Sequence, residues 1–419
     1  MAEYKGIDYL RNKLQQKALR VNLRYEYYEM KDTQTPVGLV IPPELQQMYR
    51  STLGWCSKAV DSMADRLLFR EFDNDNFEIN VIFAMNNPDV LFDSAVTSAL
   101  ISSCAFVYIS ADVDGYPRLQ VIDGGNATGI IDPITGLLTE GYAVLSRDAV
   151  SGNPTKEAYF IAGQTTYIEG KKQYTLGNPA PYPLLVPIIY RPDARRPFGH
   201  SRISRACMYT QRYAKRILER SDISAEFYSY PQKYVLGTDP DRDPMDKWRA
   251  TIASMIEFSR GEDGTVPNVG QFTQQSMSPF IEQLRASASV FAGETGLTLD
   301  DLGFATENPS SADAIKAAHE NLRLAARKAQ RTFGTGFLNV GYLSACVRDN
   351  FEYERRQFYE TKAIWEPIFE PDAAMLSAIG DSAIKVNQSV PGYFGFDNLR
   401  NLTGIDASKE SVPTPEESE

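Results

Sequence analysis

The sequence from residue 201 to residue 227 reads SRISRACMYTQRYAKRILERSDISAEF, with neither glycine nor proline. These are the two residues that most often interrupt a helix. Apolar residues recur along the stretch at close to helical spacing. The pattern predicts a single long helix of about 40 Å at the α-helical rise. Its apolar side consists of Ile203, Cys207, Thr210, Ala214, Ile217, Leu218 and Ala225.

A compact insertion and a second helix are expected after this long helix. Residues 233–236 and 269–272 have strand character, and a short helix is expected near residues 244–255. Ser278 followed by Pro279 is typical of a helix start. The order is therefore helix, small α/β insertion, helix. The second helix has Phe280, Leu284, Ala288 and Phe291 on its apolar face.

Before residue 200 the chain combines helices with short strands. Helices are expected over residues 4–28 and 43–68, and again from Pro88, where proline suits the first turn. From Ala105 the pattern changes to β-type runs separated by Gly, Asp, Asn and Pro turns. We therefore expect an antiparallel β region attached to helices, an α+β fold. The runs are Phe106–Ile109, Leu119–Ile122, Gly129–Ile131, Tyr142–Leu145 and Tyr159–Ile161.

A Gly-, Asp- and Thr-rich connection at residues 293–309 leads into another long helical pattern. Ser310 and Asp313 form a capping-box-like start to it. Three glycines then follow closely, and we expect a kink or break there. Short helical stretches are expected after Phe358, and an acidic disordered tail at the end. The glycines are Gly334, Gly336 and Gly341, and turns are expected at Pro367, Pro371 and Pro391.

Charge is unevenly distributed along the 419 residues. The net charge of −11 comes from 43 Lys+Arg against 54 Asp+Glu, and residues 360–419 carry 4 of these bases and 11 of these acids. The segment from Arg191 to Arg216 holds eight basic residues and a single acid, Asp193. An acidic chain is a poor candidate for gripping nucleic acid, because phosphate binding depends on Lys and Arg displacing counterions.

Several protein classes are excluded by what the sequence lacks. The longest apolar stretch, Val96–Ile109, is interrupted by Ser and Thr and is too short for a membrane span. The first residues lack the apolar core of a secretory signal. The four cysteines stand apart, which argues against zinc ribbons and disulfide frameworks. We expect a protein of a reducing, cytoplasmic-type compartment.

Two stretches approach known ligand-binding motifs without matching them. Between Gly163 and Gly170 six residues intervene where a phosphate-binding loop has four, and Lys172 replaces the hydroxyl residue in an expected β-hairpin. Residues 239–243 begin like a calcium loop, but Pro244 occupies the glycine position. We interpret that segment as a solvated turn.

No catalytic group is evident either. His200 beside Ser201 lacks the second glycine of a nucleophile elbow and is expected to pack or cap at the start of the long helix. His319 is expected on a helix face, partly buried. The basic segment has two interpretations: a nucleic-acid patch, or the polar face of a helix that pairs with neighbouring acids. Its residues are Arg202, Arg205, Arg212, Lys215 and Arg216. We expect no enzyme activity and no cofactor.

Three segments together carry a specific resemblance. They are Arg196–Gly237, which contains RPFGHSRISR and AEFYSYPQKYVLG, then the run GETGLTLDDLGF at residues 293–304, and ENPSSADAI at residues 307–315. Their order and spacing resemble the portal proteins of tailed bacteriophages with long non-contractile tails. The resemblance covers about Tyr4 to Asp349. The alternative, from another class, is a cytoplasmic metal- or phosphate-dependent nucleic-acid-processing enzyme.

The resemblance implies a portal-type fold with the following parts. Residues 1–200 would form the wing, 201–229 and 277–295 two stem helices, and 230–276 an α/β clip between them. Residues 296–309 would be a tunnel loop, 310–358 a long kinked helix of the wing, 359–406 a helical crown and 407–419 the acidic tail. DNA-facing residues would be Thr298, Thr306 and Asn308, and the clip would dock through Asp241, Arg242, Lys247 and Arg249.

The resemblance also implies the partners. Copies of the chain would form a ring, in this family commonly a dodecamer, at one capsid vertex of the virion, after assembly in the host cytoplasm. Double-stranded DNA would pass through the ring, driven by the ATPase of a separate large terminase subunit. Major capsid, scaffolding and head-tail adaptor proteins would contact it, and no membrane is expected.

Overall fold

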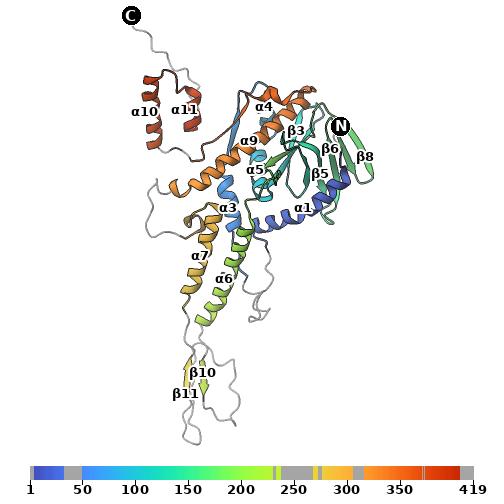
Figure 1. Cartoon of the computed structure of the whole chain (residues 1–419). Helices are drawn as coiled ribbons and strands as arrows, with labels where there is room; N and C mark the ends of the chain where they lie inside the picture. The colour runs from blue at the N-terminus through green and yellow to red at the C-terminus, as the bar shows by residue number, and fades with distance from the viewer. Residues whose placement is uncertain are drawn as a thin grey trace.

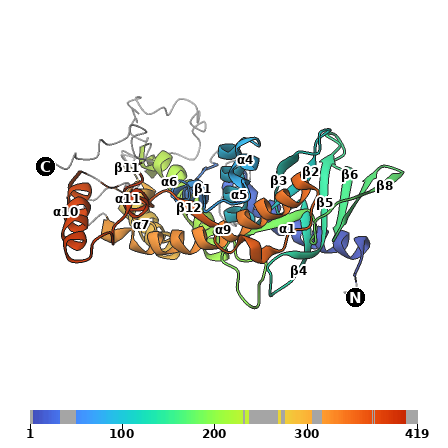
Figure 2. The same cartoon turned by 90° about the horizontal axis from the view of Figure 1, so that it is seen from above.

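The computed structural model describes residues 4–32, 50–229, 233–236, 268–271, 276–304, 316–369, 371 and 373–405. An elongated body extends from α10 at one end to β8 at the other (Figure 2), and α6 and α7 lead away from it towards β10 and β11 (Figure 1). The described helices are α1 (Ile7–Tyr28), α3 (Trp55–Ala64), α4 (Ile79–Ala84), α5 (Pro88–Ser102), α6 (Arg205–Ser229), α7 (Ser278–Thr295), α9 (Glu320–Asp349), α10 (Ala373–Ser389) and α11 (Phe396–Thr403), with 3₁₀ turns η1 (Asp300–Leu302) and η2 (Arg355–Phe358).

The strands form small antiparallel sheets, as the α+β prediction requires. One sheet has the order β3-β2-β9, another the order β4-β5-β6-β7-β8, and β1-β12 and β10-β11 are separate pairs. The strands are β1 (Phe69–Asp73), β2 (Cys104–Ala111), β3 (Pro117–Ile122), β4 (Ala127–Ile131), β5 (Leu138–Arg147), β6 (Pro154–Ile161), β7 (Gln164–Glu169), β8 (Lys172–Gly177), β9 (Leu185–Ile189), β10 (Lys233–Leu236), β11 (Asn268–Gln271) and β12 (Lys362–Trp365).

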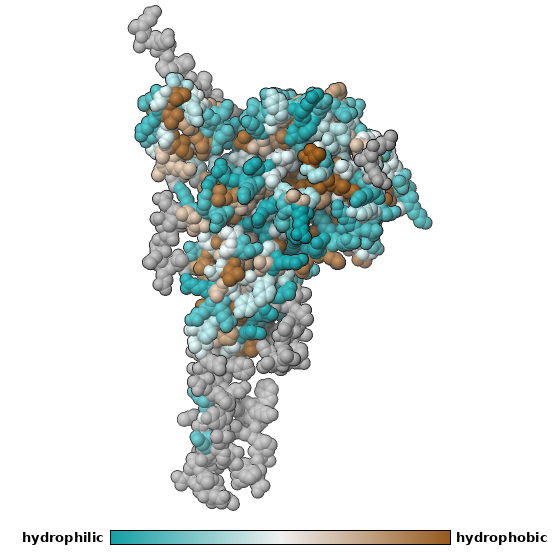
Figure 3. Space-filling view, in the orientation of Figure 1, coloured by the Kyte–Doolittle hydropathy of each residue, from teal (hydrophilic) through white to brown (hydrophobic). Residues whose placement is uncertain are grey.

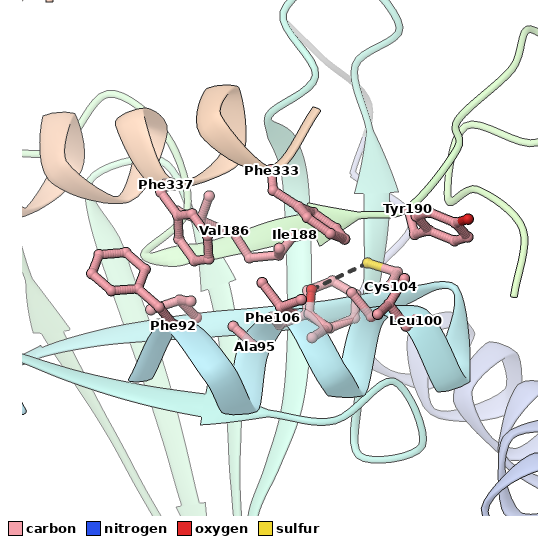
Figure 4. Close-up of a cluster of buried hydrophobic side chains, with 14 of the residues drawn as sticks. Phe92, Ala95, Leu100, Cys104, Phe106, Val186, Ile188, Tyr190, Phe333 and Phe337 are labelled. Atoms are coloured by element: carbon pink, nitrogen blue, oxygen red, sulfur yellow. Dashed lines mark hydrogen bonds between the residues drawn. The ribbon is translucent and has the colours of Figure 1, made fainter. Parts of the chain in front are cut away.

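The main core lies between α5, the strands β2 and β9, and α9 (Figure 4). Phe106 of β2, Ile188 of β9 and Phe333 and Phe337 of α9 are fully buried there. Burial of each such side chain stabilises the fold by about 1.5–3 kcal/mol. The long apolar run in the sequence, Val96–Ile109, is explained by this core, because α5 and β2 are both buried within it.

Most expected elements are confirmed, but the helix expected over residues 43–68 is described only as α3, because residues 50–54 are not helical and residues 43–49 lie outside the described residues. All five β-type runs lie in β2 to β6, and residues 163–172 form the β7–β8 hairpin. The long helix begins at Arg205 rather than at residue 201. Ser204 explains the later start, because its hydroxyl accepts the backbone N–H of Cys207 at 3.2 Å, as an N-cap residue does. The short helix expected at residues 244–255 lies outside the described residues.

The break expected in the glycine-rich helix does not occur. Helix α9 continues through Gly334, Gly336 and Gly341 to Asp349. Each glycine allows a neighbour to approach: a Cβ on Gly334 would lie 2.8 Å from the Ala363 Cβ, and one on Gly336 would lie 2.8 Å from a methyl of Ile188. The glycines therefore serve close packing.

Residues 362–365 form a strand that the sequence pattern does not indicate. Strand β12 pairs with β1 in antiparallel fashion, from Phe69 opposite Trp365 to Asp73 opposite Lys362. Phe358 is fully buried and stacks on Phe77 with ring centroids 4.0 Å apart. Residues 358–365 are therefore packed against the body. The helical segment after Phe358 begins at α10.

Helices α10 and α11 bury little of their apolar surface in the single chain. Ala383 is buried in α10, whereas no residue of α11 is buried. Apolar residues are visible on these helices at the upper left of Figure 3, while polar residues dominate the rest of the described surface in that view. The exposed side chains are Met375, Ile384, Val390, Tyr393, Phe396 and Leu402.

Candidate functional site

The candidate site is the arm formed by α6, the β10–β11 pair and α7. The two helices contact each other, and the strands at their far ends pair antiparallel, from Lys233 opposite Gln271 to Leu236 opposite Asn268. The helix–insertion–helix order predicted from periodicity is thus confirmed. The four clip residues Asp241, Arg242, Lys247 and Arg249 lie outside the described residues.

A buried ion pair attaches α6 to the segment that follows α1. Lys215 Nζ lies 3.0 Å from Asp32 Oδ2 and donates a second bond, also 3.0 Å, to the Asp32 carbonyl oxygen. Both side chains are 5% exposed. Nearby, the Arg212 guanidinium donates to the Tyr27 hydroxyl at 2.7 and 3.0 Å. Helix α6 is therefore held in a fixed position on the body.

Arg202 connects three elements just before α6 begins. Its guanidinium donates to the carbonyl oxygen of Ala59 in α3 and, at 2.8 Å, to that of Thr295, the last residue of α7. A cation at this position also interacts favourably with the carbonyl end of α7. Arg202 thus fixes the base of the arm where both helices meet the body.

These contacts show that the five basic residues do not form one continuous polar helix face. Arg202 and Lys215 are buried, and Arg202 precedes the helix. Arg205 and Arg212 are exposed, while Arg216 is partly buried with its guanidinium 5.7 Å from the Tyr213 ring. Lys215 forms the expected pair with an acid. Arg202 donates hydrogen bonds to carbonyl oxygens, and Arg212 donates to a hydroxyl oxygen. No sequence pattern reveals such acceptors.

The connection after α7 is anchored over its first residues. The backbone N–H and hydroxyl of Thr298 both donate to Asp301 Oδ2, at 2.8 and 2.9 Å, and His319 Nε2 lies 3.0 Å from the same oxygen. The Thr298 hydroxyl is therefore already hydrogen-bonded. Thr306 and Asn308 lie outside the described residues. Apolar side chains secure the same segment against the main core: Leu297, Leu299, Leu302 and Phe304.

Neither histidine is placed for catalysis. His200 Nε2 lies 2.6 Å from Asp193 Oδ2 at an exposed turn, and this bond lowers the pKa of Asp193 below its usual value. For Asp301, burial raises the pKa, but hydrogen bonds from Thr298 and the contact with His319 outweigh it, so the pKa is lowered overall. His319 is mostly buried, as predicted, but it is the N-cap residue of α9 and does not lie on a helix face. Both histidines are thus bound to a carboxylate in a structural contact.

The cysteines are equally unsuited to nucleophilic chemistry. All four are buried. Burial raises the pKa of Cys104 to about 12 and that of Cys346 to about 11, so the thiolate forms of both are scarce at neutral pH. Within the described ranges, no group of three or more His, Cys, Asp or Glu side chains could hold a metal ion. No described helix is long and apolar enough to span a membrane.

An open groove of about 1270 Å³ lies beside the base of the arm. The loop that contains Arg191 and His200 forms one side, and Lys328 and Arg331 of α9 form another. The sequence did not indicate this groove, because its walls come from segments more than a hundred residues apart. The one-turn spacing of Lys328 and Arg331 is a signal too common to single out.

Comparison with known proteins gives the same family as the sequence resemblance. No family model matches the chain. The portal protein of Mycobacterium phage D29 is 25% identical, and the match covers 94% of this chain and 84% of the relative. The portal protein of Mycobacterium phage L5 is also 25% identical, over 74% of this chain and 67% of the relative. The chain is similar to phage portal proteins. The resemblance inferred from its motifs is thereby confirmed.

The portal similarity includes nearly every described element, because it covers 94% of the chain. Among solved structures, a chain in the neck of a native gene transfer agent particle, computed with C12 symmetry, matches 93% of this chain and 100% of its own. That match has 12% identity and a TM-score of 0.46. A chain from the neck of the empty particle matches 84% of this chain, with 12% identity and a TM-score of 0.40.

Proposed function

We propose that the chain is a phage portal protein. Copies of it form a ring at one capsid vertex, through which a separate motor packages double-stranded DNA and through which the DNA later leaves. The observation that carries the proposal is the 25% identity to the D29 portal protein along 94% of the chain. The arm of α6, β10–β11 and α7 supports it, because the same order was expected for a stem with an inserted clip.

In this proposal α6 and α7 are the stem helices, and the insertion between them is the clip. The stem needs a firm base, since force on the moving DNA is transmitted to the capsid through it. Arg202 and the pair of Lys215 with Asp32 supply such a base.

The clip would dock the large terminase subunit and later the head-tail adaptor through Asp241, Arg242, Lys247 and Arg249. Rings with charge reversals at these four positions should assemble but fail to bind motor or adaptor in pull-downs.

The packing of the other elements supports the assignment of the wing and the crown of the proposed portal fold. The sheets, α1 to α5 and α9 form the wing, and β12 adds residues 362–365 to it. Helices α10 and α11 form the crown. Their exposed apolar side chains support this assignment, because helices that pack against neighbouring subunits bury such side chains only when the ring forms. In the virion the crown would face the capsid interior.

A portal protein is a structural component of the virion and not an enzyme. The ATPase that moves the DNA would be the terminase, and major capsid and scaffolding proteins would contact the ring during assembly in the host cytoplasm. The ring would let DNA pass without gripping it. The net charge of −11 supports this, because tight phosphate binding requires many Lys and Arg contacts.

Electron microscopy of the purified chain, combined with native mass measurement, tests the proposal. We expect closed rings of one size, most simply dodecamers, with a central channel. Incubation with double-stranded DNA and divalent cations should leave the DNA intact. A monomer that hydrolyses nucleic acid would contradict the proposal and favour a metal-dependent nuclease.

A further inference from the structure

Helix α1 carries a row of cations on one face. Lys17, Arg20 and Arg24 recur at helical spacing, and Arg196 and Arg205 approach Arg24 from the loop before α6 and from the start of α6. We call these five residues the basic cluster. Lys17 Nζ lies 5.1 Å from the centre of the Phe106 ring. Arg24 donates to the carbonyl oxygen of Ser102 at the end of α5, at 3.4 Å.

No member of the basic cluster forms an ion pair with a described residue, although Arg196 contacts His200 at 3.3 Å and His200 in turn binds Asp193. Burial lowers the pKa of Arg24, and the charges of Arg20, Arg196 and Arg205 lower it further. Asp123 attracts Lys17, but its two oxygens already accept bonds from the Gly125 N–H and the Asn126 side chain, both at 2.6 Å. The end of a helix supplies only about half a negative charge. The positive charge of the five cations near the end of α5 thus exceeds the partial negative charge of that helix end.

An acidic cluster lies at the opposite end of α5. It consists of Asp65, at the end of α3, with Asp89 and Asp93 in the first two turns of α5. All three side chains are exposed, and none forms an ion pair with a described residue. Burial raises the pKa of Asp93, and Asp89 and Asp65 raise it further.

The two clusters cannot neutralise each other in one chain. At the α-helical rise, Asp93 lies about 13 Å and Asp89 about 20 Å along α5 from Ser102, which Arg24 contacts. Charges further apart than about 8–10 Å are largely screened at physiological salt. Each cluster therefore lacks an ion-pair partner among the residues that the structure describes.

Exposed apolar side chains accompany both clusters. Leu19 and Leu23 lie on the outward face of α1 beside Arg20, and Leu19 is 76% exposed. Met85, just after α4, and Val90, next to Asp89, are each 61% exposed. Apolar centres with a charged rim are typical of protein–protein contacts. A duplex would gain nothing from the leucines, so the surfaces favour a protein partner over DNA.

We propose that the basic cluster of one copy docks on the acidic cluster of the next copy around the ring. Complementary charge and apolar surface at opposite ends of α5 are what a head-to-tail contact requires, and such contacts close into rings. The inference rests on the proposed portal function, because it assigns which surfaces join neighbouring subunits. The partner is a second copy of this chain.

Charge reversal with rescue tests the contact. Arg20→Glu with Arg205→Glu reverses the basic side, and Asp65→Lys with Asp93→Lys reverses the acidic side. All four positions are exposed. Arg205→Glu places an acid at the start of α6, and Asp65→Lys places a base at the end of α3. Both charges are favourable at those helix ends, so the variants should still fold. Ring assembly is measured against protein concentration by mass photometry, and circular dichroism checks folding.

In either double variant, like charges meet at every contact between neighbouring subunits. We therefore expect the protein concentration at which half of the chains are in rings to rise on the order of tenfold or more. The fourfold variant should assemble again, and so should an equimolar mixture of the two double variants. Lys171→Glu with Lys172→Glu, in the exposed β7–β8 turn, is the control with the same charge change and should assemble normally.

The outcomes separate this inference from the function on which it rests. Rings that form normally from both double variants, or no recovery in the fourfold variant, would overturn the contact and leave the portal proposal standing. Intact rings that lose binding to a double-stranded oligonucleotide when Arg20 and Arg205 are reversed would identify DNA as the partner instead. A wild-type chain that stays monomeric at every concentration would overturn both.

Discussion

Lys215 and Asp32 illustrate how much a single buried charge pair contributes to the position of a whole helix. Their contact joins α6 to the end of the α1 segment, and both side chains are almost completely removed from water. Desolvation makes such a pair a weak source of net stability, but the loss of one partner leaves an uncompensated charge. The pair therefore fixes where α6 can sit more than it adds to the total free energy of folding.

Lys215→Met should lower the free energy of unfolding by about 3–5 kcal/mol, because the Asp32 carboxylate stays buried without its partner. Adding Asp32→Asn should recover part of this loss. Arg212→Met is the matched control, since it removes hydrogen bonds to a neutral hydroxyl from an exposed position and should cost about 1–2 kcal/mol. Urea unfolding gives both values. Equal losses for the two single variants would contradict the argument.

Sequence spacing could not identify which cations of this segment turn inward. Helical periodicity placed Arg202 and Lys215 with Arg205 on a polar face, because Lys and Arg usually remain in water. Their long side chains can instead carry the charge past apolar neighbours to an acceptor. For Arg202 the acceptors are carbonyl oxygens of Ala59 and Thr295, which become acceptors only once α3 and α7 are in place.

At the scale of elements, the three glycines of α9 show tertiary packing overriding helix propensity. A glycine inside a helix costs roughly 0.5–1 kcal/mol relative to alanine, which is why a break was expected. The helix persists because the absent side chains allow β12, β9 and α4 to approach it closely. For Gly334 the neighbouring atom is the Ala363 Cβ, which cannot move without its strand.

Gly334→Ala and Gly380→Ala should therefore have opposite effects. At Gly334 the new methyl displaces β12 and should cost about 1–2 kcal/mol, despite the better helix propensity of alanine. At Gly380, in α10, nothing lies within 4 Å of the added carbon, and the same change should stabilise that helix by up to about 1 kcal/mol. Hydrogen–deuterium exchange should show faster exchange in β12 and slower exchange in α10. Slower exchange in both places would contradict the packing argument.

The elements that sequence predicts well are those whose pattern is local. Strands β2 to β6 show apolar and β-branched runs between turn residues, and α6 has an uninterrupted helical pattern. Strand β12 was missed because four residues carry no clear alternation and their partner, β1, lies almost three hundred residues earlier. The basic cluster on α1 was missed for a similar reason, since two of its members come from the segment before α6 and from α6 itself.

At the scale of the whole molecule, the anchored loop after α7 limits which residues could reach DNA in the proposed portal ring. Leu297, Leu302 and Phe304 pack on the core, and Thr298 is hydrogen-bonded to Asp301. In the proposed portal ring we therefore expect any contact with a moving duplex to come from the residues after Phe304, including Thr306 and Asn308. Their neutral side chains suit brief contacts, because even six to ten charged phosphate contacts would make binding strong and steeply salt-dependent.

Deletion of residues 305–309 should therefore reduce the DNA packaged or retained per head while rings still assemble. The deletion spares all the anchors, whereas a deletion from Thr298 to Thr306 would also remove Leu302 and Phe304 and so confuse misfolding with loss of contact. Heads assembled with the variant ring are purified, and their DNA content is measured together with ring mass. Leu297→Ala is the matched control, since it weakens the anchor and leaves the loop residues in place. Normal packaging and retention by the deletion variant would show that these residues do not contact the moving DNA.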